Sequence, residues 1–181
     1  VCGMFTWEGF DYIGEPTPYQ WPSRSSNFGI VDLCGFPKDT YYLYKSQWKP
    51  EEPVLHILPH WNWKKGDIVE VWVYTNFDSV ELFLNGRSLG EKSFKGGYDD
   101  VLHLAWIIPW EPGELKGVAR KDNMHEIMET SIFTSGHAHH IKLDADGLSF
   151  MDENDLIYIT AKICDKAGRI VPTAHDPVQF T

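Results

Sequence analysis

The sequence predicts a mostly-β chain built around one complete β-sandwich. Between residues 54 and 134, seven runs of 6–10 residues carry alternating or continuous apolar residues. Turn residues separate these runs about every 8–12 positions, which is typical of a sandwich. The hydrophobic fraction is 43% over 181 residues, enough to build a core. After residue 134 a similar strand pattern begins again.

The first 50 residues differ from the rest because they hold 12 of the 26 aromatic residues. Residues 2–7 predict a short buried strand, and residues 8–38 show no sustained periodicity. An irregular segment of this length is rare in a compact domain and is usually functional. Asp39 predicts the start of a helix that ends before Pro50. One strand and one helix bury too little surface to form a domain alone.

The middle of the chain alternates as strands do. In the stretch VEVWVYT, Val69, Val71 and Val73 point away from the residues between them. Asn85-Gly86 is a strong hairpin signal, because both residues tolerate positive φ. Pro109 predicts an edge or the end of a strand, since proline donates no ladder hydrogen bond. The seven predicted strands are residues 54–59, 67–76, 80–86, 87–94, 101–110, 113–121 and 125–133.

The last part begins with a polar linker, SGHAHH, at residues 135–140. Strands follow at residues 141–146 and 155–165, then a turn over residues 165–168 and two shorter runs, RIVPTA and PVQFT. This pattern predicts the first three or four strands of a second sandwich, with part of its core missing. We therefore expect both ends of the chain to be cut from a larger protein.

Charge and composition exclude several functions. The net charge is −10 with no basic patch, which excludes nucleic acid and an anionic membrane surface as partners. The longest apolar run is well short of the roughly 18 residues of a membrane span. Cys2, Cys34 and Cys164 have no CxxC or zinc spacing. No carboxylate or cysteine completes a metal set with the histidines of the 135–140 linker, so no metal site is expected.

The residues around Trp7 are typical of a sugar-binding site and not of a nucleophilic catalytic site. No serine elbow, phosphate loop or HExxH motif is present, so the residues alone nominate no nucleophile. Trp7 stands just before the irregular segment, beside Glu8 and Asp11. Aromatic rings flanked by carboxylates match the apolar faces and hydroxyls of sugars. Core or interface packing of these aromatic residues is the alternative. Glu8 and Asp11 are more simply structural acids than a catalytic pair.

The first segment, GMFTWEGFDYIGEPTPYQWPSRSSNFGIVDLCGFPKDTYYLYKSQW, resembles the last strand, loop and helix of the catalytic (β/α)8 barrel in glycoside hydrolase family 2, in its β-galactosidase branch. LHILPHWNWKKGDIVEVWVYTNFDSVELFLNGRSLGEKSF resembles the immunoglobulin-like domain after that barrel, and the stretch from residue 140 resembles the start of a bacterial Ig-like domain. The resemblance implies a barrel end at residues 1–50, an Ig-like β-sandwich at 51–134 and a truncated second Ig-like sandwich at 135–181.

The resemblance also implies roles for single residues. The family's W-x-x-x-D pattern matches Trp7 and Asp11, and its tryptophan forms a wall of the sugar subsite. Phe28 stands where β-glucuronidases of the family have a lysine for the substrate carboxylate, and where large galactosidases have a phenylalanine beside the C6 hydroxyl and a sodium site. Trp7, Asp11 and Phe28 are therefore the predicted substrate-binding residues, and a neutral sugar is favoured. The family's two catalytic glutamates lie on earlier strands, so no catalytic residue is expected here.

The parent enzyme is expected to hydrolyse terminal β-galactosides with retention, and this fragment alone is expected to be inactive. His60 and Trp61, at the junction of the first two domains, are predicted to reach an aglycone or to pack between domains. Expected partners are a β-galactoside-containing oligosaccharide and the upstream catalytic barrel. No cofactor is expected, because a sodium or magnesium ion of the parent finds no ligand set here.

Two alternatives remain open at this stage. One is a non-catalytic carbohydrate-binding or adhesion module of Ig-like domains. The other is a sister specificity, β-glucuronidase or β-mannosidase. No secretory signal is visible at the start of the sequence. The bacterial character of the resemblance nevertheless favours a periplasmic or extracellular location for the parent enzyme.

Overall fold

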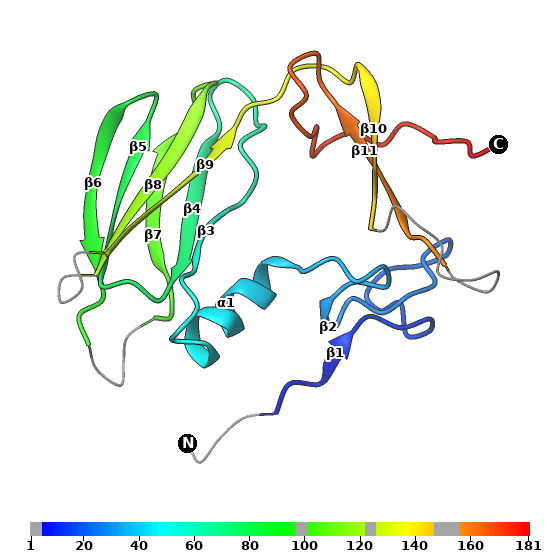
Figure 1. Cartoon of the computed structure of the whole chain (residues 1–181), viewed down its shortest axis with the longest axis horizontal. Coiled ribbons are helices and arrows are strands. Elements are labelled where there is room, and N and C mark those ends of the chain that lie inside the picture. Colours follow the sequence, from blue (N-terminus) through cyan, green and yellow to red (C-terminus); the bar gives the residue numbers. More distant parts are fainter. Residues whose placement is uncertain (1–4, 97–100, 122–125, 147–155) are drawn as a thin grey trace.

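A computed structural model shows a β-sandwich flanked by two smaller parts (Figure 1). The structure describes residues 5–96, 101–121, 126–146 and 156–181. The elements in chain order are β1 (Glu8–Phe10), β2 (Gly29–Val31), α1 (Asp39–Trp48), β3 (Leu55–Leu58), β4 (Ile68–Thr75), β5 (Ser79–Leu84), β6 (Arg87–Ser93), β7 (Leu104–Pro109), β8 (Glu114–Lys121), β9 (Glu126–Phe133), β10 (His140–Ala145) and β11 (Ile159–Cys164). No helix among these residues is long and apolar enough to span a bilayer.

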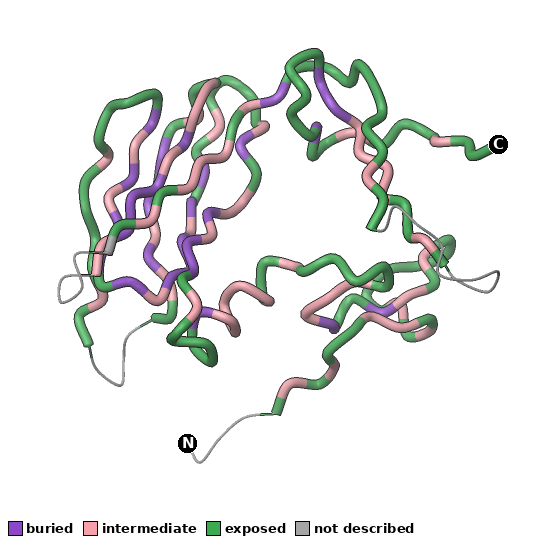
Figure 2. The backbone as a smooth tube through the Cα atoms, in the orientation of Figure 1, coloured by how far each residue is buried: buried purple, intermediate pink, exposed green. Residues whose placement is uncertain are grey.

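The sandwich confirms the seven strands predicted between residues 54 and 134. Strands β3, β4 and β7 form one antiparallel sheet, and β6, β5, β8 and β9 form the other. Val71, Val73, Val80, Leu82 and Leu115 are completely inaccessible to solvent and form the centre of the core between the sheets. Figure 2 shows buried stretches along the strands of the sandwich, interrupted by intermediate and exposed positions. The two sheets with a core between them confirm the mostly-β fold class.

The predicted Asn85-Gly86 hairpin is confirmed and is tied to a second turn. Both residues have positive φ, 51° and 80°, as a tight hairpin between β5 and β6 requires. Asn85 Oδ1 accepts the Glu114 N–H at 2.9 Å, and Nδ2 donates to the Pro112 carbonyl at 3.0 Å. Pro109 is the last residue of β7, an edge strand, as its missing N–H predicts.

The first segment corrects the predicted positions of its strand and irregular loop. Residues 2–4 of the expected strand lie outside the described part, and β1 begins only after Trp7, so Trp7 precedes this strand instead of ending it. β1 pairs in parallel with β2, which interrupts the segment predicted to be irregular. The backbones of β1 and β2 approach so closely that a Cβ added to Gly29 would lie 2.3 Å from the backbone nitrogen of Asp11. Three-residue strands carry no periodicity, and their pairing is set by partners distant in sequence.

Helix α1 confirms the predicted bounds, from Asp39 to the residues before Pro50. Asp39 Oδ1 lies 2.7 Å from His56 Nε2 on β3, and the Tyr42 ring stacks on His56 at 3.9 Å. These contacts join the helix to the sandwich. Within this chain the aromatic residues of α1 lie partly or largely exposed, and Trp48 is 63% exposed.

The last part contains fewer strands than predicted in the portion that the structure describes, residues 135–146 and 156–181. β10 and β11 pair antiparallel, and β10 already begins at His140, inside the predicted linker. Among the described residues, RIVPTA makes only an isolated bridge between Ile170 and Cys164, and PVQFT forms no strand. Pro172 and Pro177 donate no ladder hydrogen bond, which explains part of this difference. The predicted turn over residues 165–168 is present, with Asp165 Oδ1 accepting two backbone N–H groups.

Candidate functional site

Trp7 and Phe28 line the same hollow, of about 420 Å³, together with Glu15 and Thr17. We refer to these four residues as the Trp7 hollow. Trp7 immediately precedes β1 and Phe28 immediately precedes β2. Because the two strands are parallel with Glu8 opposite Gly29, the residues before them become neighbours. Trp7 is 76% exposed and Phe28 is 43% exposed, so both rings remain available to a ligand.

Glu15 supplies the one carboxylate among the described residues that line the Trp7 hollow. Its backbone has a φ of 45°, which is uncommon for a residue with a side chain, and it follows Gly14 with a φ of 119°. The Tyr12 hydroxyl donates a hydrogen bond to the Glu15 carboxylate. This hydrogen bond, with a smaller effect of burial, raises the pKa of Tyr12, while a hydrogen bond with Trp7 opposes the rise. Tyr12 therefore links a carboxylate of the hollow to its main aromatic wall.

Asp11 does not line the Trp7 hollow. Its side chain is 7% exposed, and Lys38 Nζ lies 2.7 Å from Oδ2 and 2.8 Å from Oδ1. Asp11 Oδ1 also accepts the Gly29 N–H at 2.9 Å. Burial raises the pKa of Asp11, but the hydrogen bonds from Lys38 and Gly29 and the lysine charge outweigh it and hold the pKa below its ordinary value.

Lys38 extends this contact to the residue beside Phe28. Its Nζ also donates to the Asn27 carbonyl at 3.3 Å. The Asp11–Lys38 pair therefore joins the end of β1, the start of β2 and the residue before α1, and it fixes the backbone that carries Phe28. The predicted sugar contact of Asp11 stays a prediction. In this structure its contacts are with the protein.

Sequence reasoning missed Tyr12, Glu15, Thr17 and Lys38 as parts of this site. Tyr12 and Glu15 are three residues apart, but their segment has no helical or strand periodicity to indicate that they face each other. Lys38 is 27 residues from its partner Asp11. A contact of that separation leaves no signal in a single sequence.

The structure places His60 and Trp61 differently from each other. Trp61 is 1% exposed in the sandwich core, and its Nε1 donates to the Glu111 carbonyl at 3.0 Å. Its ring therefore cannot reach an aglycone, because the two sheets enclose it. His60 is exposed and stacks on Trp63 at 5.3 Å, and its predicted contact with an aglycone stays a prediction.

The histidines of the 135–140 linker show no arrangement typical of a metal centre. The rings of His139 and His140 meet edge to face at 5.6 Å. Across the described ranges, no group of three histidine, cysteine or acidic side chains could hold a metal ion. Cys34 is exposed, Cys164 is buried, and both are free thiols, while Cys2 lies outside the described residues.

Known proteins match this arrangement across nearly the whole chain. The β-galactosidase BoGH2A of Bacteroides ovatus is 47% identical over 183 residues, covering 100% of this chain and 21% of that protein. The crystal structure of a glycosyl hydrolase family 2 member from Bacteroides cellulosilyticus superimposes with a TM-score of 0.77 at 30% identity, covering 90% of this chain and 25% of that one. This chain belongs to glycoside hydrolase family 2.

Other matches show how much of a family 2 protein the chain represents. A β-glucuronidase of Formosa agariphila is 30% identical, covering 84% of this chain and 16% of that protein. The family 2 chain thus spans a quarter or less of the length of each of these three relatives. A family model described as a domain of unknown function, DUF4982, matches residues 66–125, which lie within the sandwich.

Proposed function

We propose that this chain is part of a retaining glycosidase that removes terminal β-galactosides, and that the Trp7 hollow is one wall of its sugar subsite. The observation that carries the proposal is the meeting of Trp7 and Phe28, two residues singled out from the sequence, in one hollow with Glu15. Exposed indole and phenyl faces suit the C–H face of a sugar, and a carboxylate suits its hydroxyls. The β-galactosidase from Bacteroides ovatus is a relative that supports this substrate class.

The charge of the Trp7 hollow supports a neutral sugar over a uronate. Its lining contains Glu15 and no lysine or arginine among the described residues. A substrate carboxylate would face the like charge of Glu15 and the apolar ring of Phe28. Lys38, the nearby cation, already pairs with Asp11. This argument disfavours a β-glucuronidase, although three relatives from Formosa agariphila carry the name β-glucuronidase or putative β-glucuronidase.

Retaining hydrolysis uses two carboxylates about 5–5.5 Å apart, one as acid and base and one as nucleophile. Among the described residues, the Trp7 hollow contributes a single carboxylate, and Tyr12 already donates to it. We therefore propose that both catalytic glutamates belong to another part of the parent protein and that the 181 residues alone do not turn over a chromogenic β-galactoside.

The exposed apolar surface of the first segment supports a covering partner. Phe5, Phe10, Leu33, Phe36 and Trp48 are all largely exposed within this chain. Two short parallel strands and one helix are the pattern of an incomplete parallel β/α unit, whose strands are normally buried on both faces. We propose that the upstream catalytic barrel of the same protein covers this surface and completes the subsite.

The full-length protein provides the test, with p-nitrophenyl β-galactoside as substrate. Replacing Trp7 with alanine should lower kcat/KM by about 10–100-fold, because burying an aromatic side chain is worth about 1.5–3 kcal/mol. Phe180→Ala is the control, since Phe180 is similarly exposed but lies outside both the hollow and the first segment. Equal activity of the Trp7 variant and wild type would sink the subsite proposal.

The alternatives from other classes have their own tests. An adhesion module of Ig-like domains is favoured only by the sandwich and the β10–β11 pair. Full-length protein that turns over no glycoside would support it. A sister specificity is tested with matched β-galactoside, β-glucuronide and β-mannoside substrates. Preference for the glucuronide would contradict the argument from Glu15 and Phe28.

A further inference from the structure

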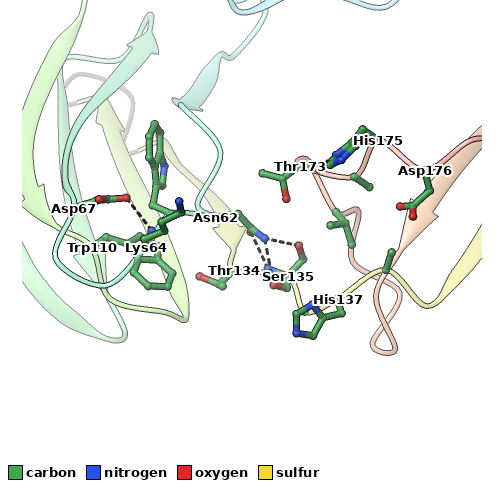
Figure 3. Close-up of a pocket in the computed structure, with 15 residues that line it drawn as sticks. Asn62, Lys64, Asp67, Trp110, Thr134, Ser135, His137, Thr173, His175 and Asp176 are labelled. Atoms are coloured by element: carbon green, nitrogen blue, oxygen red, sulfur yellow. Dashed lines mark hydrogen bonds between the residues drawn. The ribbon is translucent and has the colours of Figure 1, made fainter.

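A second and larger hollow lies between the sandwich and the β10–β11 part. Its volume is about 840 Å³, and it is lined by residues 62–64, 67, 110, 134–138, 171 and 173–176. We refer to it as the Trp63 hollow. Figure 3 shows one wall from the sandwich, with Lys64, Asp67 and Trp110, and a facing wall from the last segment, with Thr173, His175 and Asp176. None of these residues belongs to the Trp7 hollow.

Two tryptophan rings in the lining are held by their own N–H groups. Trp63 Nε1 donates to the His60 carbonyl at 2.8 Å, and Trp110 Nε1 donates to the Trp61 carbonyl at 3.2 Å. Both polar atoms are therefore satisfied by the protein, and a ligand meets ring surface without having to compete for them. Trp63 stacks on His60, yet the residue remains 39% exposed. Fixed, exposed aromatic surface is what a sugar face requires.

The floor of the Trp63 hollow is rigid. Asn62 Nδ2 donates to Ser135 Oγ at 2.8 Å, and the Ser135 N–H donates back to Asn62 Oδ1 at 2.9 Å. The Gly136 N–H donates to Asp165 Oδ2 at 2.8 Å, which joins the floor to the turn after β11. Asp165 is buried, and hydrogen bonds from the Gly136 and Arg169 N–H groups hold its pKa below the ordinary value. A preorganised floor reduces the entropy that a ligand must lose on binding.

The polar groups of the lining match a neutral ligand with many hydroxyls. Asp67 and Asp176 can accept hydrogen bonds, whereas Lys64 can donate them, and His137 and His175 can do both. Asp67 Oδ2 already accepts the Lys64 N–H at 2.9 Å, which orients that carboxylate. With two acids and one lysine, the lining offers no cationic cluster for a phosphate or a uronate. Sugar hydroxyls both donate and accept, so they can use this mixed set.

We propose that the Trp63 hollow is a second carbohydrate-binding site, which takes one or two units of a neutral saccharide stacked on Trp63. Its volume lies within the range of small-molecule sites. The site does not depend on the Trp7 hollow or on catalysis. It would bind one part of a glycan beside the sandwich while another sugar unit of the same glycan is cleaved elsewhere in the protein.

The test titrates the 181-residue chain with lactose, cellobiose, xylobiose and maltose, following tryptophan fluorescence and indole N–H signals in ¹⁵N NMR spectra. At least one disaccharide should bind saturably and shift the indole signals of Trp63 and Trp110. Trp63→Ala should weaken that binding about tenfold or more, equivalent to about 1.4 kcal/mol. Asp176→Ala, a change at an exposed side chain, should weaken it several-fold and serves as a second variant if Trp63→Ala unfolds.

Two matched controls separate this site from the Trp7 hollow. Trp48→Ala removes an exposed tryptophan outside both hollows and should leave the affinity unchanged, whereas Trp7→Ala should leave the sugar-induced shifts of the Trp63 and Trp110 indole signals unchanged. Loss of binding in Trp7→Ala with retention in Trp63→Ala would assign the sugar to the Trp7 hollow and overturn the proposal. Absence of saturable binding by all four disaccharides, or equally tight binding of glucuronate, would also overturn it.

Discussion

Trp61 is the side chain whose replacement best separates a core role from a substrate-binding role. The residue is 1% exposed and packs between the two sheets. Its Nε1 donates to the Glu111 carbonyl at 3.0 Å. Its own carbonyl accepts hydrogen bonds from Trp110 Nε1 at 3.2 Å and from Thr134 Oγ1 at 2.8 Å. Trp61 thus anchors both the core and the loops at one end of the sandwich.

The cost of Trp61→Ala follows from these contacts. Removing a large buried aromatic ring costs about 3–5 kcal/mol, and the Glu111 carbonyl left without its donor adds about 1 kcal/mol. The sum, about 4–6 kcal/mol, is comparable to the whole stability of many small domains. Trp61→Phe keeps part of the ring volume and loses the hydrogen bond, so about 1–3 kcal/mol is expected. His60→Ala changes an exposed neighbour and should cost less than about 0.5 kcal/mol.

Urea unfolding of the chain, followed by circular dichroism, measures these differences as shifts of the midpoint at constant slope. The expected order of stability is wild type and His60→Ala together, then Trp61→Phe, then Trp61→Ala. If Trp61→Ala unfolded within about 1 kcal/mol of wild type, the ring would not be carrying the core. The aglycone role inferred from the sequence would then have to be considered again for Trp61.

Two further predictions concern the hairpin turns and the Asp11–Lys38 pair. Gly113→Ala should lower the free energy of unfolding in urea by about 2–4 kcal/mol, because φ is 136° and the new Cβ would lie 1.8 Å from Asn85 Oδ1. Gly136→Ala is the control. It should lower the free energy of unfolding clearly less, because the atom nearest to its new Cβ is 3.6 Å away. The Asp11 carboxyl should titrate below its ordinary pKa in ¹³C NMR spectra. The stability it contributes is complete above that ordinary value and is lost as pH falls through the lowered folded pKa. Lys38→Met should raise the pKa of Asp11, because burial raises this pKa and the lysine that lowers it is gone. An unchanged Asp11 pKa in the variant would contradict the pairing.

The sandwich could be predicted because its signals are local. Val69, Val71 and Val73 alternate with residues of the opposite face, and this pattern survives folding because each strand has one buried side. Asn85-Gly86 specifies its hairpin through two backbone conformations that few other residues adopt. The bounds of α1 were similarly set by the residues that start and end it.

The errors have a common physical origin. β1 and β2 are three residues each, and only their mutual hydrogen bonds make them strands. RIVPTA has the composition of a strand, but among the described residues it finds only one bridging partner, from Ile170 to Cys164. A strand forms its ladder hydrogen bonds only with neighbouring strands, so composition alone predicted more strands in the last part than its described residues contain.

The sequence by itself determined the family resemblance, the seven strands of the sandwich, helix α1 and the separate importance of Trp7 and Phe28. Only the tertiary structure decided that those two rings share a hollow with Glu15, that Asp11 pairs with Lys38 beneath it, and that Trp61 is buried. The reason is that periodicity and turn chemistry act over a few neighbouring residues. The parallel β1–β2 pair and the packing of two sheets instead bring together side chains separated by tens of residues.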